Sequence, residues 1–331
     1  TMKNFKIHFP SLTAAILYTL MAGQAAIADD TEVLIGSGGG NWPIPNVLFI
    51  MDTSGSMGNN IAGDTPTAND PSRLSIVQGV FSELMTKYSE PNSKLKFNVA
   101  LMRFDSTDDS NSNNTGGSFI TPMQLLDSST KTAIINASNN LTAGAHTPLA
   151  ESLYEAALYY RGETVHFGNL ATPNNVATVL NPNDDSKYLS PITTQCQANS
   201  IILLTDGEPT GDTEADDLIE ALANTTCSGN CLDELAEFLY TTDQSTTLAS
   251  DHKVKTYTIG FTTNQTLLED AASKGGGSYM TAVNATQLKS AFERALGRGV
   301  IEGTNKSFSP PAMAANAFNN ISHTNMLYFT P

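Results

Sequence analysis

Five oxygen-bearing side chains have types and spacings that suit a metal ion. Asp52 ends the apolar segment "NVLFIMD", and Ser54 and Ser56 follow it two and four residues later. Asp206 ends a second apolar segment, "SIILLTD", and Thr147 precedes a proline at the expected start of a helix. Oxygen ligands without cysteine or histidine suit a hard divalent cation, with Mg²⁺ expected first and Mn²⁺ or Ca²⁺ as alternatives.

The expected positions of these residues explain how they could meet. In an open parallel sheet, ligands bind outside the carboxyl ends of the strands, so Asp52 and Asp206 can converge although 154 residues separate them. Taken singly, Asp52 could only cap a turn, and Ser54 and Ser56 could only be turn formers. Because only two of the five side chains carry charge, a bound ion would remain electron-poor and favour a carboxylate from outside the protein. The five together therefore indicate recognition.

The elements that must position these residues alternate along the chain. Short apolar runs alternate with longer amphipathic periods from residue 46, which predicts an α/β fold with a mostly parallel sheet. The expected strands are 46–52, 96–104, 200–206 and 254–261. The expected helices are 72–88, 147–162, 232–243 and 284–297, of which the second has Thr147 as its cap and ends at Gly162.

Two polar segments interrupt this alternation, at about 105–118 and 162–198. Both are too polar and irregular for core elements, so we expect surface insertions. In the first, Asp105, Thr107 and Asp109 alternate like the start of a calcium loop, but the central glycine and the terminal glutamate are missing. A solvated loop is therefore the favoured interpretation.

The two ends of the chain differ from the middle. Residues 1–28 combine Lys3 and Lys6 with an apolar run and a small-residue cleavage pattern, which predicts a secretory signal peptide. A membrane anchor is the alternative, but the run is shorter than the roughly 20 apolar residues that span a bilayer. Residues 29–45 are a glycine- and proline-containing leader, and residues 301–331 resemble the start of a following β-rich region.

The net charge limits the possible partners, and the cysteines indicate a possible disulfide. The formal charge is −16, and removal of residues 1–28 would leave 15 basic against 33 acidic side chains. Such a charge repels nucleic acid and anionic membrane surfaces. The segment "CSGNC" could close a disulfide between Cys227 and Cys231, with zinc as a disfavoured rival. Cys196 is expected either as a buried thiol or as a disulfide partner of that loop.

Three of these motifs resemble a known family. "DTSGS", the threonine of "HTPLAESL" and "LLTDGEP" match, residue by residue, the metal-ion-dependent adhesion site of von Willebrand factor A domains. The resemblance covers about residues 46–300. It implies a doubly wound sheet flanked by helices, in which five residues hold the metal directly or through water: Asp52, Ser54, Ser56, Thr147 and Asp206.

A narrower resemblance concerns the signal peptide and several short segments. Segments such as "PNVLFIMDTSGSMG", "CSGNCLDELAEFLYTTD" and "SPPAMAANAFNN" look like the amino-terminal half of the PilC/PilY family of type IV pilus tip-associated adhesins. That resemblance implies a secreted protein of the periplasm, outer membrane and pilus tip, with minor pilins or pilus-tip components as partners. In the family a β-propeller follows, which residues 1–331 do not include.

Other functions are disfavoured by what the motifs lack. Some phosphotransferases use a nucleophilic aspartate followed two residues later by an acidic aspartate, but here that second position is Ser54. No Gly-x-Ser-x-Gly or His-Glu-x-x-His motif occurs, so no enzyme activity is expected. The alternatives are a generic surface A-domain unrelated to pili and a partner subunit of a metal-inserting ATPase, and the signal peptide disfavours the latter.

Overall fold

The structure is a computed structural model that describes residues 43–106, 115–144, 146–169, 177–249 and 251–302. The expected signal peptide, most of the expected leader, residues 107–114 and residues 303–331 lie outside these ranges. The solvated loop expected after residue 106 and nearly all of the β-rich region expected at 301–331 therefore stay sequence predictions. In the described part of the chain, every helix is too short or too polar to cross a membrane.

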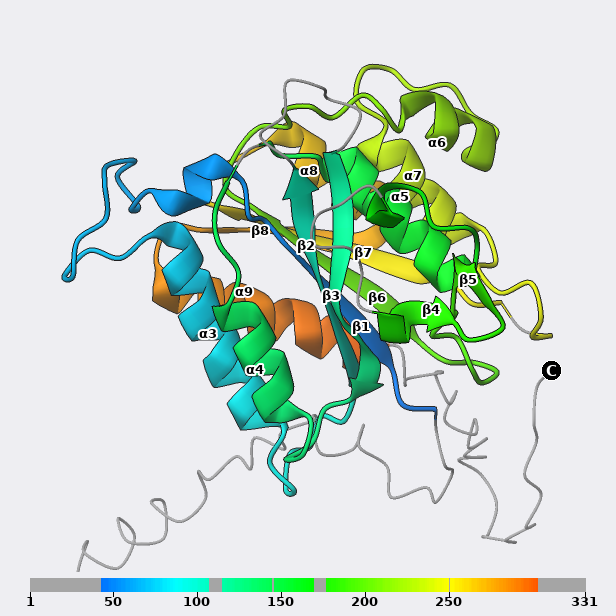
Figure 1. The fold of residues 1–331 in the computed structure, drawn as a ribbon, viewed down its shortest axis with the longest axis horizontal. Coiled ribbons are helices and arrows are strands. Elements are labelled where there is room, and N and C mark those ends of the chain that lie inside the picture. The colour runs from blue at the N-terminus through cyan, green and yellow to red at the C-terminus, as the bar shows by residue number, and fades with distance from the viewer. Residues whose placement is uncertain (1–42, 107–114, 145, 170–176, 250, 303–331) are drawn as a thin grey trace, which may run out of the picture. The chain divides into compact units, whose positions relative to one another are not determined.

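A six-stranded sheet forms the centre of the described residues, in the order β3-β2-β1-β6-β7-β8 (Figure 1). All neighbours are parallel except β2 and β3, which are antiparallel. The strands of this sheet are β1 (Asn46–Met51), β2 (Asn98–Ser106), β3 (Thr115–Leu125), β6 (Asn199–Thr205), β7 (Val254–Phe261) and β8 (Gly276–Ala282). The mostly parallel sheet predicted from the sequence is confirmed.

Helices cover both faces of this sheet, as a doubly wound fold requires (Figure 1). One face carries α3 (Arg73–Tyr88), α4 (Lys131–Asn139) and α9 (Ala285–Gly297). The other carries α5 (Leu149–Arg161), α6 (Asp216–Ala223), α7 (Leu232–Thr241) and α8 (Thr266–Lys274). The short elements are η1 (Gly55–Gly58), η3 (Phe167–Asn169), η4 (Ala177–Val179), β4 (Leu180–Asn181), β5 (Asp184–Tyr188) and η5 (Arg298–Glu302).

The two central strands are buried on both sides, which explains their unbroken apolar sequences. Every residue of β1 and β6 is buried. On the first face, Phe49 of β1 packs against Phe81 and Phe292, with ring centroids 5.1 and 5.7 Å apart. A strand covered by helices on both faces needs apolar residues at successive positions rather than at alternate ones.

The helices expected at 72–88 and 284–297 are confirmed to within one residue, and both starts are capped. Ser72 caps α3 by accepting a hydrogen bond from Ser75 N, and Asn284 caps α9 by accepting from Gln287 N. Gly162 ends α5 in the left-handed conformation, at a φ of 68°. The prediction that Thr147 caps α5 is wrong, because Pro148 occupies the cap position and the helix begins at Leu149.

The sequence analysis missed edge strand β3, and the boundary of the insertion at 105–118 is wrong as a result. Strand β2 continues to Ser106, and β3 starts at Thr115. The β3 sequence contains Gly116, Gly117 and Pro122, which are typical of loops. At Gly117 an added Cβ would lie 2.0 Å from Met102 Cε, so the glycine permits close packing on the neighbouring strand. Strand β8 and helices α4, α6 and α8 were also missed.

The expectation that the insertion at 162–198 stays outside the core is wrong. Phe167, Val179 and Tyr188 are buried in the core of the α5 face. The buried carboxylate of Glu155 anchors this segment, because it accepts hydrogen bonds from the backbone N–H groups of His166 and Phe167 and from the Tyr188 hydroxyl. An irregular, polar sequence therefore supplies a few apolar anchors to the core.

The cysteine predictions are confirmed in one part and corrected in another. Cys227 and Cys231 form the expected disulfide, in the loop before α7. Cys196 is exposed rather than buried, and it takes no part in that disulfide. Cys196 lies in a turn before β6, where its φ is 59°.

The buried Glu155 carboxyl makes the stability of the folded protein depend on pH. Burial raises the pKa of Glu155 to about 7, although hydrogen bonds from Tyr188, Phe167 and His166 oppose the shift. Between the unfolded value near 4.5 and about 7 the folded protein binds the extra proton, so stability falls as pH rises through this window. The contribution reaches at most about 1.4 kcal/mol per pH unit.

We therefore expect Glu155→Gln to lose less free energy of unfolding than the unsubstituted protein when pH rises from about 5 to about 7.5. Urea denaturation at the two pH values measures the difference. Glu90→Gln, at an exposed position, is the matched control and should keep the original pH dependence. Equal pH dependence in Glu155→Gln and the unsubstituted protein would show that Glu155 ionises normally.

Candidate metal centre

The pairing of β1 with β6 brings the two predicted aspartates together. Met51 pairs with Leu204 at the last position of the β1 register, so the next residues of the two strands leave the sheet side by side. Asp52 Oδ2 accepts hydrogen bonds from Thr205 Oγ1 at 2.7 Å and from Asp206 N at 3.1 Å. Both aspartates are buried, at 0% and 5% exposure. The carboxyl edge of the sheet thus holds two adjacent buried carboxylates.

The serines lie between these carboxylates, in a tight turn. Ser54 N donates to Asp52 Oδ1 at 2.6 Å, which folds the chain back directly after β1. The turn continues as η1, which places Ser54 Oγ 3.0 Å from Ser56 Oγ. Ser56 Oγ in turn donates to Asp206 Oδ1 at 2.6 Å. Four of the five predicted residues therefore form one hydrogen-bonded cluster.

Thr147 reaches the same edge through its backbone. Its N–H and C=O pair with Thr210 at 3.1 and 3.2 Å, and Thr210 lies four residues after Asp206. Nearby, Gly144 N donates to Thr53 O at 2.7 Å, which joins the loop before α5 to the turn after β1. Thr147 is buried, at 5% exposure. The structure thus ties Thr147 to the loops of the cluster, and its backbone pairing replaces the predicted helix-capping role.

The electrostatics of the cluster favour compensation by a cation. Burial, followed by the charge of Asp206, raises the pKa of Asp52 to about 6, while hydrogen bonds from Ser54 and Thr205 lower it. The Asp52 carboxyl is therefore ionised at neutral pH at an energetic cost. A positive charge placed beside Asp52 would remove that cost.

Arg73 contacts the candidate site, and the sequence analysis missed it. It begins α3, and its guanidinium Nη1 lies 2.7 Å from Asp206 Oδ2. The Arg73 side chain is 13% exposed and that of Asp206 is 0% exposed, so water screens this ion pair weakly. No local pattern marks Arg73, because the pairing joins residues 133 positions apart.

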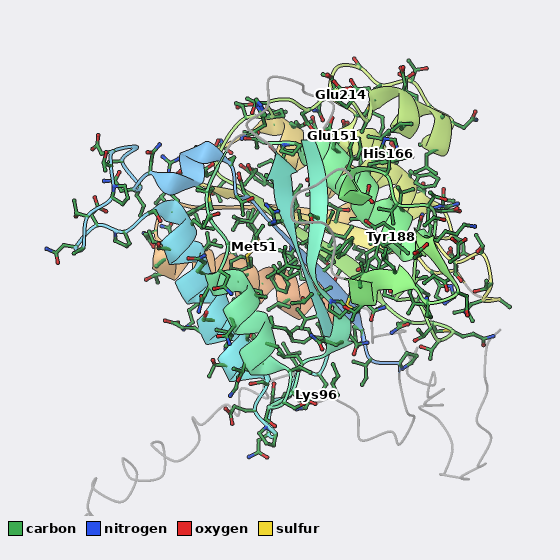
Figure 2. All side chains as sticks on the ribbon, in the orientation of Figure 1. Met51, Lys96, Glu151, His166, Tyr188 and Glu214 are labelled. Carbon is green, nitrogen blue, oxygen red and sulfur yellow. A yellow bond between two sulfur atoms is a disulfide. The ribbon has the colours of Figure 1, made fainter. Side chains whose placement is uncertain are left out.

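A second buried carboxyl pair supports the loops around the cluster. Glu151 Oε1 accepts from Glu214 N at 2.8 Å, and both residues are labelled in Figure 2. Asp212 Oδ1 accepts from Ala150 N at 2.7 Å. Burial and the neighbouring Asp212 raise the pKa of Glu151, and burial raises that of Asp212, so the pair keeps a proton. It fastens the start of α5, after Thr147, to the loop after Asp206.

The donor set fits a small hard cation. Within the described residues, no group of three or more His, Cys, Asp or Glu side chains is arranged for metal binding, and the cluster instead offers two carboxylates and two hydroxyl groups. Ser54 Oγ and Ser56 Oγ lie 3.0 Å apart. Adjacent oxygens around an octahedral Mg²⁺ lie at about this distance, given metal–oxygen bonds of about 2.1 Å. Asp52, Ser54, Ser56 and Asp206 would hold such an ion.

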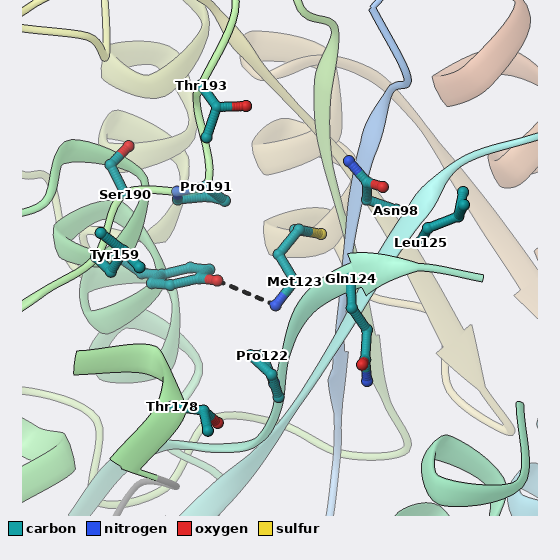
Figure 3. A pocket seen from close by; sticks show the side chains of 11 residues that line it. Asn98, Pro122, Met123, Gln124, Leu125, Tyr159, Thr178, Ser190, Pro191 and Thr193 are labelled. Atoms are coloured by element: carbon teal, nitrogen blue, oxygen red, sulfur yellow. Dashed lines mark hydrogen bonds between the residues drawn. The ribbon is translucent and has the colours of Figure 1, made fainter. Parts of the chain in front are cut away.

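The pocket shown in Figure 3 lies at the end of the sheet where β2 starts, opposite the carboxyl ends of the parallel strands. It has a volume of about 340 Å³ and is lined by residues that include Asn98 at the start of β2 and Leu125 at the end of β3. Its titratable lining residue is Tyr159, whose hydroxyl accepts a hydrogen bond from Met123 N at 3.1 Å. Burial raises the pKa of Tyr159 to about 12, so this pocket offers no acid or base near neutral pH.

Comparisons with known proteins give matches among solved structures. A scan against protein-family models found no match, and a search of curated proteins found none either. Among solved structures, a von Willebrand factor type A protein from Catenulispora acidiphila is 14% identical, with a TM-score of 0.46 and coverage of 78% of this chain and 43% of that one.

Two other solved structures give similar values. Proximal thread matrix protein 1 from the mussel byssus is 14% identical, with a TM-score of 0.43 and coverage of 78% of this chain and 46% of that one. The PilB minor pilin from Streptococcus sanguinis is 15% identical, with a TM-score of 0.45 and coverage of 79% and 63%. The chain thus spans less than two thirds of each of these proteins.

Thr205 should matter to the site through Asp52. Thr205→Val keeps the side-chain shape but removes the hydroxyl that donates to Asp52 Oδ2, so we expect Mn²⁺ affinity to fall about tenfold. Thr258→Val is the matched control, since Thr258 is equally buried and its hydroxyl donates to Leu268 O of helix α8, away from the cluster. Calorimetric titration with Mn²⁺ measures both, and an equal loss of affinity in the two variants would contradict the role of Thr205.

Proposed function

We propose that this protein is a metal-dependent recognition domain that binds a carboxylate of a protein or surface ligand through a divalent cation. The observation that carries this proposal is the hydrogen-bonded cluster of Asp52, Ser54, Ser56 and Asp206 at the carboxyl edge of the sheet. Mg²⁺ is the proposed ion, with Mn²⁺ or Ca²⁺ as alternatives, because all of the donors are hard oxygens.

The charge of the chain supports a bridging ion. With a formal charge of −16, the protein repels an anionic partner unless a cation lies between them. Two carboxylates with neutral hydroxyls leave a bound ion able to attract a further anionic ligand. A carboxylate is the commonest such group on protein surfaces, which makes a protein the proposed partner.

Binding rather than catalysis is the proposed activity. Ser54 occupies the position where an aspartyl phosphotransferase needs an acid, and a hydroxyl cannot replace that acid near neutral pH. The pocket at the opposite edge of the sheet has Tyr159 as its titratable group, and the raised pKa of Tyr159 keeps it neutral. Neither place offers a pair of acid and base groups.

The finer proposal is a role in a type IV pilus. The signal-like residues 1–28 and the resemblance of several segments to the PilC/PilY adhesins support a secreted protein that assists pilus assembly and surface attachment. Its proposed location is the periplasm, the outer membrane and the pilus tip, and its proposed partners include minor pilins. A surface A-domain unrelated to pili is the alternative, and it would use the same metal site.

Metal binding is tested by titrating Mn²⁺ or Mg²⁺ into the protein by isothermal calorimetry. We expect one site in the unsubstituted protein and at least about a hundredfold loss of affinity in Asp52→Asn, which keeps the shape and removes one of the two charges. Asp217→Asn is the control, because it removes the same charge at an exposed position of α6. An Asp52→Asn variant that binds the cation as tightly as the unsubstituted protein would contradict the assignment of Asp52 to the metal site.

The pilus role is tested in the source bacterium. A strain that lacks residues 46–300 should make fewer pili and attach less to surfaces, and a strain with Asp52→Asn should lose attachment. Electron microscopy counts the pili, and an adhesion assay measures attachment, with an Asp217→Asn strain as control. Normal pili and normal attachment in the deletion strain would refute the pilus role and leave metal binding to be judged separately.

A further inference from the structure

Arg73 is the only basic group paired with the cluster among the described residues, and its pairing is one-sided. Its Nη1 lies 2.7 Å from Asp206 Oδ2, whereas Asp52 has no basic partner within the same part of the chain. The guanidinium also donates from Nη2 to Ile61 O at 3.5 Å, and the backbone N–H of Arg73 donates to Asn59 O at 2.8 Å. The guanidinium therefore lies beside the cluster as a fixed positive charge.

The two oxygens of Asp206 have different neighbours. Oδ1 accepts from Ser56 Oγ at 2.6 Å and so faces the hydroxyl groups, while Oδ2 faces Arg73. Asp206 can therefore keep its pairing with Arg73 and still present Oδ1 to a cation. In contrast, both Asp52 oxygens bond only to hydroxyl and backbone N–H donors. The arrangement divides the carboxylates into one that is neutralised and one that is not.

We infer that Arg73 is an internal counter-charge that weakens cation binding and strengthens the attraction of the bound cation for an anionic ligand. Two carboxylates and one guanidinium carry one net negative charge, so a divalent ion gives the cluster one net positive charge. Without Arg73 the loaded cluster would be neutral. This inference rests on the proposed function, and it names the residue that sets the balance between holding the ion and holding the ligand.

A purely structural ion pair is the competing explanation, and it makes a different prediction. If Arg73 served only to anchor the start of α3 to the loop after β6, its removal would loosen Asp206 and leave cation affinity unchanged or lower. If Arg73 is a counter-charge, its removal exposes Asp206 to the cation and raises that affinity. The direction of the change in affinity therefore separates the two roles.

The test uses three variants and Mn²⁺ alone as the probe. Arg73→Met and Arg73→Gln remove the charge with different polarity, and Arg73→Lys keeps the charge. By calorimetry we expect both neutral variants to bind Mn²⁺ at least about tenfold more tightly, and Arg73→Lys to stay within about threefold of the unsubstituted protein. Mn²⁺ should also raise the melting temperature more in the neutral variants, because it replaces the lost partner of Asp206.

A second readout concerns the anionic ligand. Acetate added to the Mn²⁺-saturated proteins reports on the loaded site, since its methyl NMR signal broadens when it approaches the ion. We expect weaker acetate binding in Arg73→Met and Arg73→Gln than in the unsubstituted protein and Arg73→Lys. Equal acetate affinity in all four proteins would overturn the inference that Arg73 strengthens the attraction of the bound cation for an anionic ligand.

The outcomes separate this inference from the proposed function. If the unsubstituted protein binds no Mn²⁺, the proposed function fails regardless of Arg73. If it binds Mn²⁺ and both folded neutral variants bind it equally or less tightly, the inference fails while the proposed function stands. If one neutral variant fails to fold, the Mn²⁺ affinity of the other decides the test. If both fail to fold, with and without Mn²⁺, Arg73 has the structural role instead.

Discussion

Two carboxylates held side by side in a buried environment are the constraint on which this part of the structure depends. The parallel register of β1 against β6 makes Asp52 and Asp206 neighbours, and Asp52 Oδ2 accepts the backbone N–H of Asp206. Like charges this close repel, and burial increases the cost. The surrounding hydroxyls, backbone donors and Arg73 reduce that cost without removing it, as the raised pKa of Asp52 shows.

The rest of the fold keeps this cluster in shape from several directions. Helices pack on both faces of β1 and β6, which leaves the ends of these strands for a site, and the cluster occupies the carboxyl end. The loop that contains Thr147 is held there by its pairing with Thr210 and by the protonated pair of Glu151 and Asp212. A site with few charged groups needs this support, because neutral hydroxyls bind a cation only when they are correctly placed.

Features that depend on local sequence could be predicted, and features that depend on distant pairing could not. The unbroken apolar runs of β1 and β6, the bounds of α3 and α9, and the glycine after α5 all follow from local rules. Strand β3 was missed because its glycines and proline are typical of loops, although an edge strand accepts them.

The site shows the same division. The positions of Asp52 and Asp206 follow from strand ends, but the contact of Arg73 with Asp206 joins distant segments and has no local pattern. Thr147 was expected to cap a helix because a proline follows it, and its backbone instead pairs with Thr210.

A crystal grown with Mn²⁺ and measured at the manganese absorption edge tests most directly whether the cluster binds a cation. We predict one anomalous peak within bonding distance of Ser54 Oγ and Ser56 Oγ, whereas a Mn²⁺ peak only elsewhere, or none at saturating Mn²⁺, would contradict it.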